Sequence, residues 1–159
     1  MACGPPADYS PWLGHWVQSR FEEETFEAVL AKKGFPYPLR KLMTNFIAER
    51  KFFLDGDRFM LTTKMLGFDT IKKFWNTCPM NEPTSFSVLG YSIVATLTWE
   101  DDGNTFVSTT VTTSEEGYVL SGWTTTTRMT HRIEPNGEMA VTTIEPNGDR
   151  YTNWLTKVQ

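Results

Sequence analysis

The chain has 159 residues, a formal net charge of −4 and a pI of about 5.2. This length predicts one domain, and the acidic balance excludes nucleic acid as an expected partner because phosphate binding relies on surplus Lys and Arg. No stretch approaches the roughly 20 apolar residues of a membrane span, and the opening segment lacks the basic and apolar regions of an export signal. We therefore expect a cytoplasmic protein without stable membrane insertion.

A Pro-rich lead-in (residues 1–11) precedes the predicted domain (residues 12–159), which starts with a short strand at residues 12–19. The only helical periodicity of the sequence follows directly. The first helix carries its pattern at Phe26, Val29, Leu30 and Lys33 and stops at Gly34; the second starts at Pro38 and carries Leu39, Leu42, Met43, Phe46 and Ile47. The short linker between them predicts a helix-turn-helix pair over about residues 22–47.

Beyond residue 48 the sequence reads as strands separated by Asp-Gly, Asn-Gly and similar turns. The strands are predicted at residues 49–54, 57–66, 69–77, 84–89, 91–100, 104–113, 118–133, 138–145 and 149–158. With the first strand these make ten, and closing a sheet of that size removes its exposed edges. The prediction is a mainly β protein: a ten-stranded up-and-down antiparallel barrel with a helical lid, too wide for its own side chains to fill.

Signatures of catalysis and of cofactor binding are weak. The sequence holds no nucleophile elbow, phosphate loop, dinucleotide fingerprint or His-Glu-x-x-His pattern. Its two histidines, His15 and His131, are not accompanied by Cys or carboxylates at metal-ligand spacing. We therefore expect neither a cofactor nor a metal.

The order of features resembles that of the intracellular lipid-binding proteins, the calycin family of fatty-acid-binding and cellular retinoid-binding proteins. The similar features are a Gly-x-Trp strand at Gly14 and Trp16, a TFEAVLAKKGF helix, an LRKL helix with Arg40 and Lys41, and an FLDGDRF hairpin. The resemblance implies a clam-shaped barrel closed below by Trp16, a helical portal, and an internal cavity for a hydrophobic ligand with an acidic head.

In that family the head is typically held by an Arg on the eighth strand and an Arg-x-Tyr pair on the last. The equivalent positions here are His131, Trp154 and Thr156, and an indole cannot grip a carboxylate as a guanidinium does. Arg150, on the Trp154 face, and Arg128 are available substitutes. By this alignment Arg128 points outward, although a register one residue different would exchange it with His131.

The predicted site combines inward strand residues with residues of the helical lid. The polar or stacking contacts are His131, Trp154, Thr156 and Arg150; the apolar wall is Trp123 and Met129; the portal candidates are Phe35, Leu39, Met43 and Phe46. The wall and portal residues also fit plain core packing, and His131 also fits the role of a hydrogen-bonded wall residue.

Three functions fit this interpretation. The first is a carrier that encloses one hydrophobic molecule, such as a fatty acid, retinoid, sterol-like lipid or pigment, in a monomeric barrel. The second is a small enzyme on the same barrel, with His131 as general acid or base. In the third, the lid makes transient contact with a partner through Arg40 and Lys41 and passes the ligand on.

Overall fold

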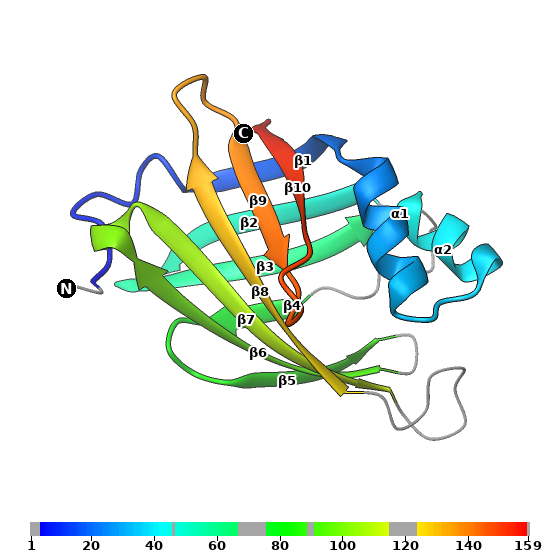
Figure 1. Ribbon diagram of the computed structural model, residues 1–159. Helices are drawn as coiled ribbons and strands as arrows, with labels where there is room; N and C mark the ends of the chain where they lie inside the picture. The colour runs from blue at the N-terminus through cyan, green and yellow to red at the C-terminus, as the bar shows by residue number, and fades with distance from the viewer. Residues whose placement is uncertain (1–3, 46, 67–75, 89–90, 115–123, 159) are drawn as a thin grey trace.

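The computed structural model describes residues 4–45, 47–66, 76–88, 91–114 and 124–158, and these form a β-barrel with two helices at one end (Figure 1). The strands are β1 (Gly14–Phe21), β2 (Ile47–Asp55), β3 (Arg58–Leu66), β4 (Asn76–Pro79), β5 (Thr84–Val88), β6 (Tyr91–Glu100), β7 (Thr105–Ser114), β8 (Thr124–Ile133), β9 (Met139–Ile144) and β10 (Arg150–Lys157). The helices α1 (Glu23–Lys32) and α2 (Tyr37–Thr44) follow β1, and a 3₁₀ turn, η2 (Asp101–Gly103), joins β6 to β7. The predicted fold class is confirmed.

All the strands named above belong to one antiparallel sheet, with the order β4-β3-β2-β1-β10-β9-β8-β7-β6-β5. The first and last strands therefore pair in the middle of the sheet. The edge strands β4 and β5 approach each other because Met80, between them, forms a bridge with Leu97 of β6, and the Asn81 N–H donates to the Leu97 carbonyl at 2.8 Å. These contacts bring the two edges together and close the barrel.

Alternation along β8 decides which of its side chains face the interior. Met129 and His131 pack against the hydrophobic core, whereas Arg128 is exposed and pairs with Glu100. Successive side chains of a strand point to opposite faces, so the odd-numbered residues of β8 face inward. Arg128 therefore points outward, as the alignment predicted.

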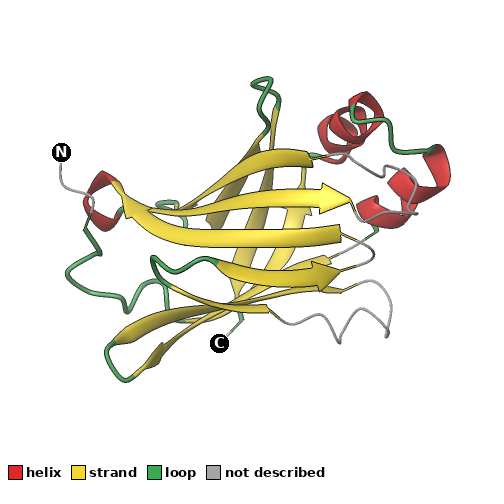
Figure 2. Cartoon of the chain, turned by 90° about the horizontal axis from the view of Figure 1, so that it is seen from below, coloured by secondary structure: helices red, strands yellow, loops and turns green. Residues whose placement is uncertain are grey.

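Buried aromatic side chains fill the end of the barrel where β1 begins, which lies away from the helices (Figures 1 and 2). The buried aromatic residues of this cluster are Trp12, Trp16, Phe52, Phe59, Trp99 and Phe106. Tyr9 stacks on Phe59 with ring centroids 4.7 Å apart, and the Trp16 indole donates to the Trp12 carbonyl at 2.9 Å. Trp16 thus closes the bottom as expected, and because Tyr9 packs here, the core begins inside the predicted lead-in.

The helices are bounded by the residues that the sequence singled out, with one correction. Gly34 ends the α1 segment with a φ of 89°, and Pro38 lies in the first turn of α2. The prediction that Ile47 continues the second helix is wrong, since Ile47 opens β2 and is exposed. The helix ends at Thr44. The Asn45 side-chain amide donates to the Lys41 carbonyl at 2.9 Å and so gives a partner to one of the last carbonyls of the helix.

Two strand predictions are only partly covered by the described residues. The strand predicted at residues 69–77 falls mostly outside them, and β4 is seen at Asn76–Pro79, paired with β3. The strand predicted at residues 118–133 is described from Thr124 onward. The first strand begins at Gly14, because Trp12 and Leu13 belong to a turn whose N–H groups bond to the Tyr9 carbonyl.

We predict that Trp12→Ala destabilises the barrel by about 3–5 kcal/mol, the usual loss for a buried aromatic side chain. Trp12 is buried and meets Trp99 edge-on, with centroids 5.0 Å apart. Urea unfolding measures the change. Tyr37→Ala is the control, because Tyr37 is exposed on α2 and its loss should alter the free energy of unfolding by at most about 0.5 kcal/mol. Equal effects of the two variants would contradict the packing role of Trp12.

Candidate ligand-binding site

The interior of the barrel changes character between its two ends. The first residues of β7 and the last residues of β8 lie at the aromatic cluster, and both strands carry hydroxyl-bearing side chains toward the helical end. The inward residues of that stretch are Ser108, Thr110, Thr112, Thr125, Thr127 and Met129. Apart from Ser108, they keep part of their surface accessible although they face inward. A close-packed core would bury them, so this half of the interior is not tightly filled.

His131 lies where the aromatic and polar halves meet. Its side chain is 1% exposed, its ring lies edge-on to Phe106, and Nδ1 is 3.2 Å from the Phe106 carbonyl oxygen. A carbonyl only accepts hydrogen bonds, so Nδ1 carries the proton and Nε2 is left as an acceptor, with no partner among the described residues. Burial, assisted by the charge of Arg50, lowers the pKa of His131 to about 3, and the imidazole is therefore neutral at neutral pH.

Arg50 is a cation inside the barrel. It shares the inward face of β2 with Ala48 and Phe52 and is 7% exposed. Its Nη1 donates to the carbonyl of Glu49 at 3.2 Å, and within the described part of the chain no carboxylate pairs with the guanidinium. Burial lowers the pKa of Arg50 to about 10, so it keeps its charge at neutral pH.

Tyr151 brings a hydroxyl to the same space from β10. It pairs in register with Thr143 of β9 and is only partly accessible. Burial, helped by the negative charge of Glu145, raises the pKa of Tyr151 to about 12, while a hydrogen bond from Thr143 and the charge of Arg50 act in the opposite direction. The phenol therefore keeps its proton and can donate a hydrogen bond.

Arg50, His131 and Tyr151 form the candidate site, which we call the interior polar group. They come from inward positions of β2, β8 and β10, and the charge of Arg50 affects the pKa of both other residues, so Arg50 lies within electrostatic reach of each of them. At neutral pH the interior polar group holds one permanent positive charge, one hydroxyl donor and one free imidazole acceptor. It can bind a negatively charged or hydrogen-bonding part of a ligand.

The predicted inward row of the last strand is wrong. β10 pairs with β9 so that Tyr151, Asn153 and Leu155 lie beside the inward residues Thr143, Val141 and Met139. The other row, which holds Arg150, Trp154 and Thr156, is on the outer face. Trp154 packs there under the Arg20 guanidinium, 3.9 Å from its ring centroid, and Arg150 and Thr156 are exposed.

The remaining predicted site residues have mixed outcomes. Met129 faces inward and packs against the core cluster. Phe35 is buried in the turn between the helices, and Leu39 and Met43 of α2 are partly buried, so their portal role stays a prediction. Trp123 and Phe46 lie outside the described residues.

Sequence reasoning missed Arg50, and by placing Arg150 and Trp154 on the inward row of the last strand it also put the alternating residue Tyr151 on the outward row. A signal for Arg50 was present, because strand alternation puts it on the same face as Phe52, two residues further on. A cation on a core face breaks the usual pattern of burial, and such a break is a sign of function. For Tyr151 there was no comparable signal, because both faces of its strand mix polar and apolar residues.

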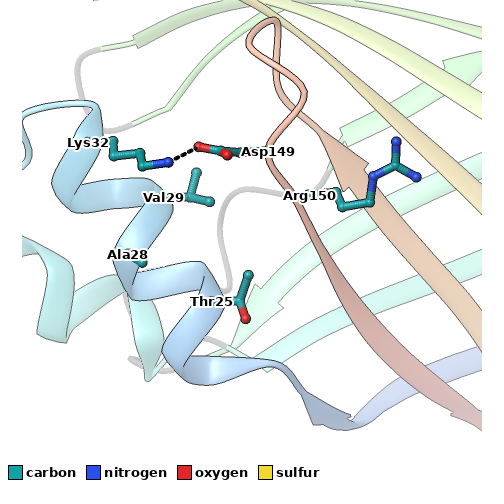
Figure 3. A pocket seen from close by; sticks show the side chains of 6 residues that line it. All are labelled: Thr25, Ala28, Val29, Lys32, Asp149 and Arg150. Atoms are coloured by element: carbon teal, nitrogen blue, oxygen red, sulfur yellow. Dashed lines mark hydrogen bonds and ion pairs between the residues drawn. The ribbon is translucent and has the colours of Figure 1, made fainter.

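Two lysines at the end of α1 join the helical lid to the β9–β10 turn, and Figure 3 shows the first of these contacts, between Lys32 and Asp149. Lys32 contacts Asp149 at 2.9 Å, and Lys33 contacts the buried Glu145 at 2.7 Å. A pocket of about 140 Å³ lies beside these contacts, lined by Thr25, Ala28, Val29, Lys32, Asp149 and Arg150. Ligand pockets usually measure roughly 300–1,000 Å³, so this one is too small to enclose a lipid.

Neither a metal site nor a membrane-spanning helix is found in the described ranges. No group of three or more His, Cys, Asp or Glu side chains there could hold a metal ion. No helix among these residues is long and apolar enough to cross a bilayer.

The fold is shared with solved structures of small lipid-binding proteins. The fatty acid binding protein of Schistosoma mansoni in complex with arachidonic acid is 16% identical, with a TM-score of 0.66 over 94% of this chain and 98% of that one. Apo lipid binding protein 8 of Caenorhabditis elegans is 17% identical, with a TM-score of 0.65 over 94% and 97%. Fatty-acid-binding protein 1 of Echinococcus granulosus is 14% identical, with a TM-score of 0.63 over 94% and 99%.

The sequence itself matches no protein-family model and no curated protein. The class defined by the fold is a β-barrel with a helical lid. Within that class the chain has the fold of the fatty-acid-binding proteins, which confirms the resemblance found in the sequence at the level of the fold. A shared fold does not fix a function, so the class of ligand depends on the side chains that line the interior of this barrel.

We predict that the protein loses stability as the pH falls from about 6.5 toward 3, because unfolded His131 takes up a proton that the folded, buried imidazole does not. Each unit of pKa difference is worth about 1.4 kcal/mol, so the contribution of His131 amounts to a few kcal/mol. Urea unfolding at about pH 7.5 and about pH 4.5 measures this, and His131→Gln should lose less stability than the wild type.

The control for this prediction is His15→Gln, which removes the other histidine from the outer face, where it contacts Glu49 at 3.2 Å. This variant should keep the His131-linked loss on acidification. Equal acid sensitivity in His131→Gln and the wild type would show that the buried imidazole does not carry the effect.

Proposed function

We propose that the protein is a carrier that encloses one hydrophobic small molecule in the helical half of its barrel. The observation that carries this proposal is the inward-facing but incompletely buried wall of β7 and β8, with Thr127 as an example. Threonine supplies a methyl group for apolar contact and a hydroxyl for ordered water, a combination suited to a ligand cavity. The aromatic cluster at the other end gives the ligand a closed floor.

The similar structures support a carrier without defining its ligand. A further one, described as a fatty acid transporter, is 15% identical with a TM-score of 0.63, and the chains cover 94% and 98% of each other. What these proteins bind is a property of those proteins. For this chain the proposal is one lipophilic ligand, such as a fatty acid, retinoid or pigment-like molecule.

The environment of His131 argues for a carrier over an enzyme that uses this residue. A general base works best with a pKa near the operating pH, whereas burial lowers the pKa of His131 to about 3. Its protonated nitrogen is also held by the Phe106 carbonyl. A neutral imidazole of this kind is a weak base and is better suited to orienting a bound group.

The proposal extends to where and how the protein works. We place the carrier in the cytoplasm as a monomer, in keeping with the net charge of −4 and the small size. Transient contact with a partner through the lid is part of the same proposal. Arg40 and Lys41 pair with Glu27 of α1, at 3.9 and 3.2 Å, so a partner would compete with contacts inside the lid.

The first test is native mass spectrometry of protein purified from its source, followed by solvent extraction of any bound compound. One apolar molecule retained at unit stoichiometry is the result expected of a carrier. If the purified protein carries no ligand but turns over a hydrophobic substrate, and His131→Gln abolishes the pH dependence of that turnover, the protein is an enzyme and not a carrier.

We predict that Thr127→Trp reduces binding of the neutral dye Nile red by about tenfold or more, because the indole would occupy the space next to Met129. Fluorescence titration measures the affinity. Thr126→Trp is the matched control, since Thr126 is the neighbouring residue of β8 and is exposed on the outer face. Equal affinities of the two variants would place the dye outside the barrel.

A further inference from the structure

We propose that Arg50 binds the anionic head of the ligand, so that the molecule carried is an amphipathic anion, with a carboxylate as its simplest form. This inference rests on the proposed carrier function and names the class of its ligand. It assigns the head group to a cation on β2, on a different strand from the positions that the family resemblance implied.

The first step of the argument is the charge of Arg50 itself. Arg50 is 7% exposed, and in the described ranges the hydrogen-bond partner of its guanidinium is the carbonyl of the neighbouring Glu49, at 3.2 Å. A guanidinium has five N–H donors in a fixed fork, and one neutral carbonyl does not neutralise it. Buried charges in proteins are normally paired, because an unpaired one carries a large desolvation penalty.

The second step is that the nearby acids are already engaged elsewhere. The Glu49 side chain contacts His15 at 3.2 Å and Lys64 at 4.0 Å on the outer face of the barrel. Glu145 is buried and its Oε1 pairs with Lys33 of the lid at 2.7 Å, while its Oε2 has no hydrogen-bond partner in the described ranges. Neither carboxylate forms an ion pair with Arg50, which leaves the guanidinium without a counter-ion in the described part of the chain. An anion bound from outside the chain would supply one.

The third step is the complementary chemistry of the other two members of the interior polar group. Tyr151 keeps its hydroxyl proton and can give a carboxylate a second hydrogen bond. His131 stays neutral, so it brings no second charge, and Arg50 remains the cation of the interior polar group. A guanidinium with a neighbouring hydroxyl is a donor set for a carboxylate, whereas a neutral ligand would leave the charge unmatched.

This placement also explains how the barrel can bind an anion without the expected residues. By the sequence resemblance, His131 stands where the family has its eighth-strand Arg, and the predicted last-strand pair, Trp154 and Thr156, lies on the outer face. The cation is instead supplied from β2, which is separated from β10 in the sheet only by β1. The absence of the expected Arg-x-Tyr pair on the last strand therefore does not imply a neutral ligand.

The test compares two probes that differ only in the head group, pyrene-labelled dodecanoic acid and its methyl ester. Fluorescence titration of the wild type should show tighter binding of the acid. Arg50→Gln should weaken binding of the acid by about 10- to 100-fold, the value of a charge-assisted contact, and leave the ester nearly unchanged. Lys51→Gln is the matched control: it removes the same charge from the next residue of β2, which is exposed, and both affinities should persist.

A second variant covers the case in which Arg50→Gln fails to fold, which urea unfolding would reveal. Tyr151→Phe keeps the ring and removes the hydroxyl, and it should weaken binding of the acid several-fold more than binding of the ester. An acid-to-ester ratio unchanged in the folded variants, or equal to one in the wild type, overturns the anion site while the carrier stands. A wild-type protein that binds neither probe refutes the carrier proposal, and the anion site with it.

Discussion

The whole arrangement depends on one constraint, that a closed sheet places every second side chain of each strand inside the barrel. A local irregularity in β1 shows how strongly this rule acts. Gln18 pairs with Leu155, but Arg20 pairs with Trp154, so the register shifts between them by one residue. The bulge returns Phe21 to the inward row opposite Asn153 and puts Arg20 outside, stacked on Trp154. One extra residue therefore keeps a second arginine out of the interior.

Within this constraint the interior combines two environments. The aromatic cluster at the bottom supplies buried apolar area and holds β2, β3, β6 and β7 together with the segment that precedes β1. The half below the helices carries hydroxyls and a charge, which contribute little to folding stability. The stability gained at one end lets the other end keep groups that serve a ligand rather than the fold.

The fold could be predicted from the sequence because the residues that set its turns and helix boundaries act locally. Both Glu-Pro-Asn-Gly turns fold as expected, with Asn136 and Asn147 accepting the backbone N–H two residues ahead, at 3.0 and 2.9 Å. Gly34 and Pro38 likewise mark the helix boundaries next to them. Each of these signals acts within a few residues, so no knowledge of the tertiary structure was needed to use it.

The candidate site was less predictable because it depends on pairing between strands. The two faces of β10 are similar in composition, and its inward face is set by Met139 and Val141 on the partner strand β9. For the same reason His131 could be placed correctly, since the hydrophobic residues around it identify its face, whereas Trp154 could not. Local patterns identify the strands, but only the assembled sheet shows which of their polar side chains meet.

The pairing of β1 with β10 also has a consequence for how the chain folds. The strand formed first during synthesis finds its partner at the far end of the sequence, and Trp12 packs against Trp99 and Phe106 from the second half. Contacts between distant parts of a chain form slowly, because a long loop must close before they are made. The barrel is therefore completed only after the last strand has been synthesised, and until then β1 has a free edge on which a second chain could pair.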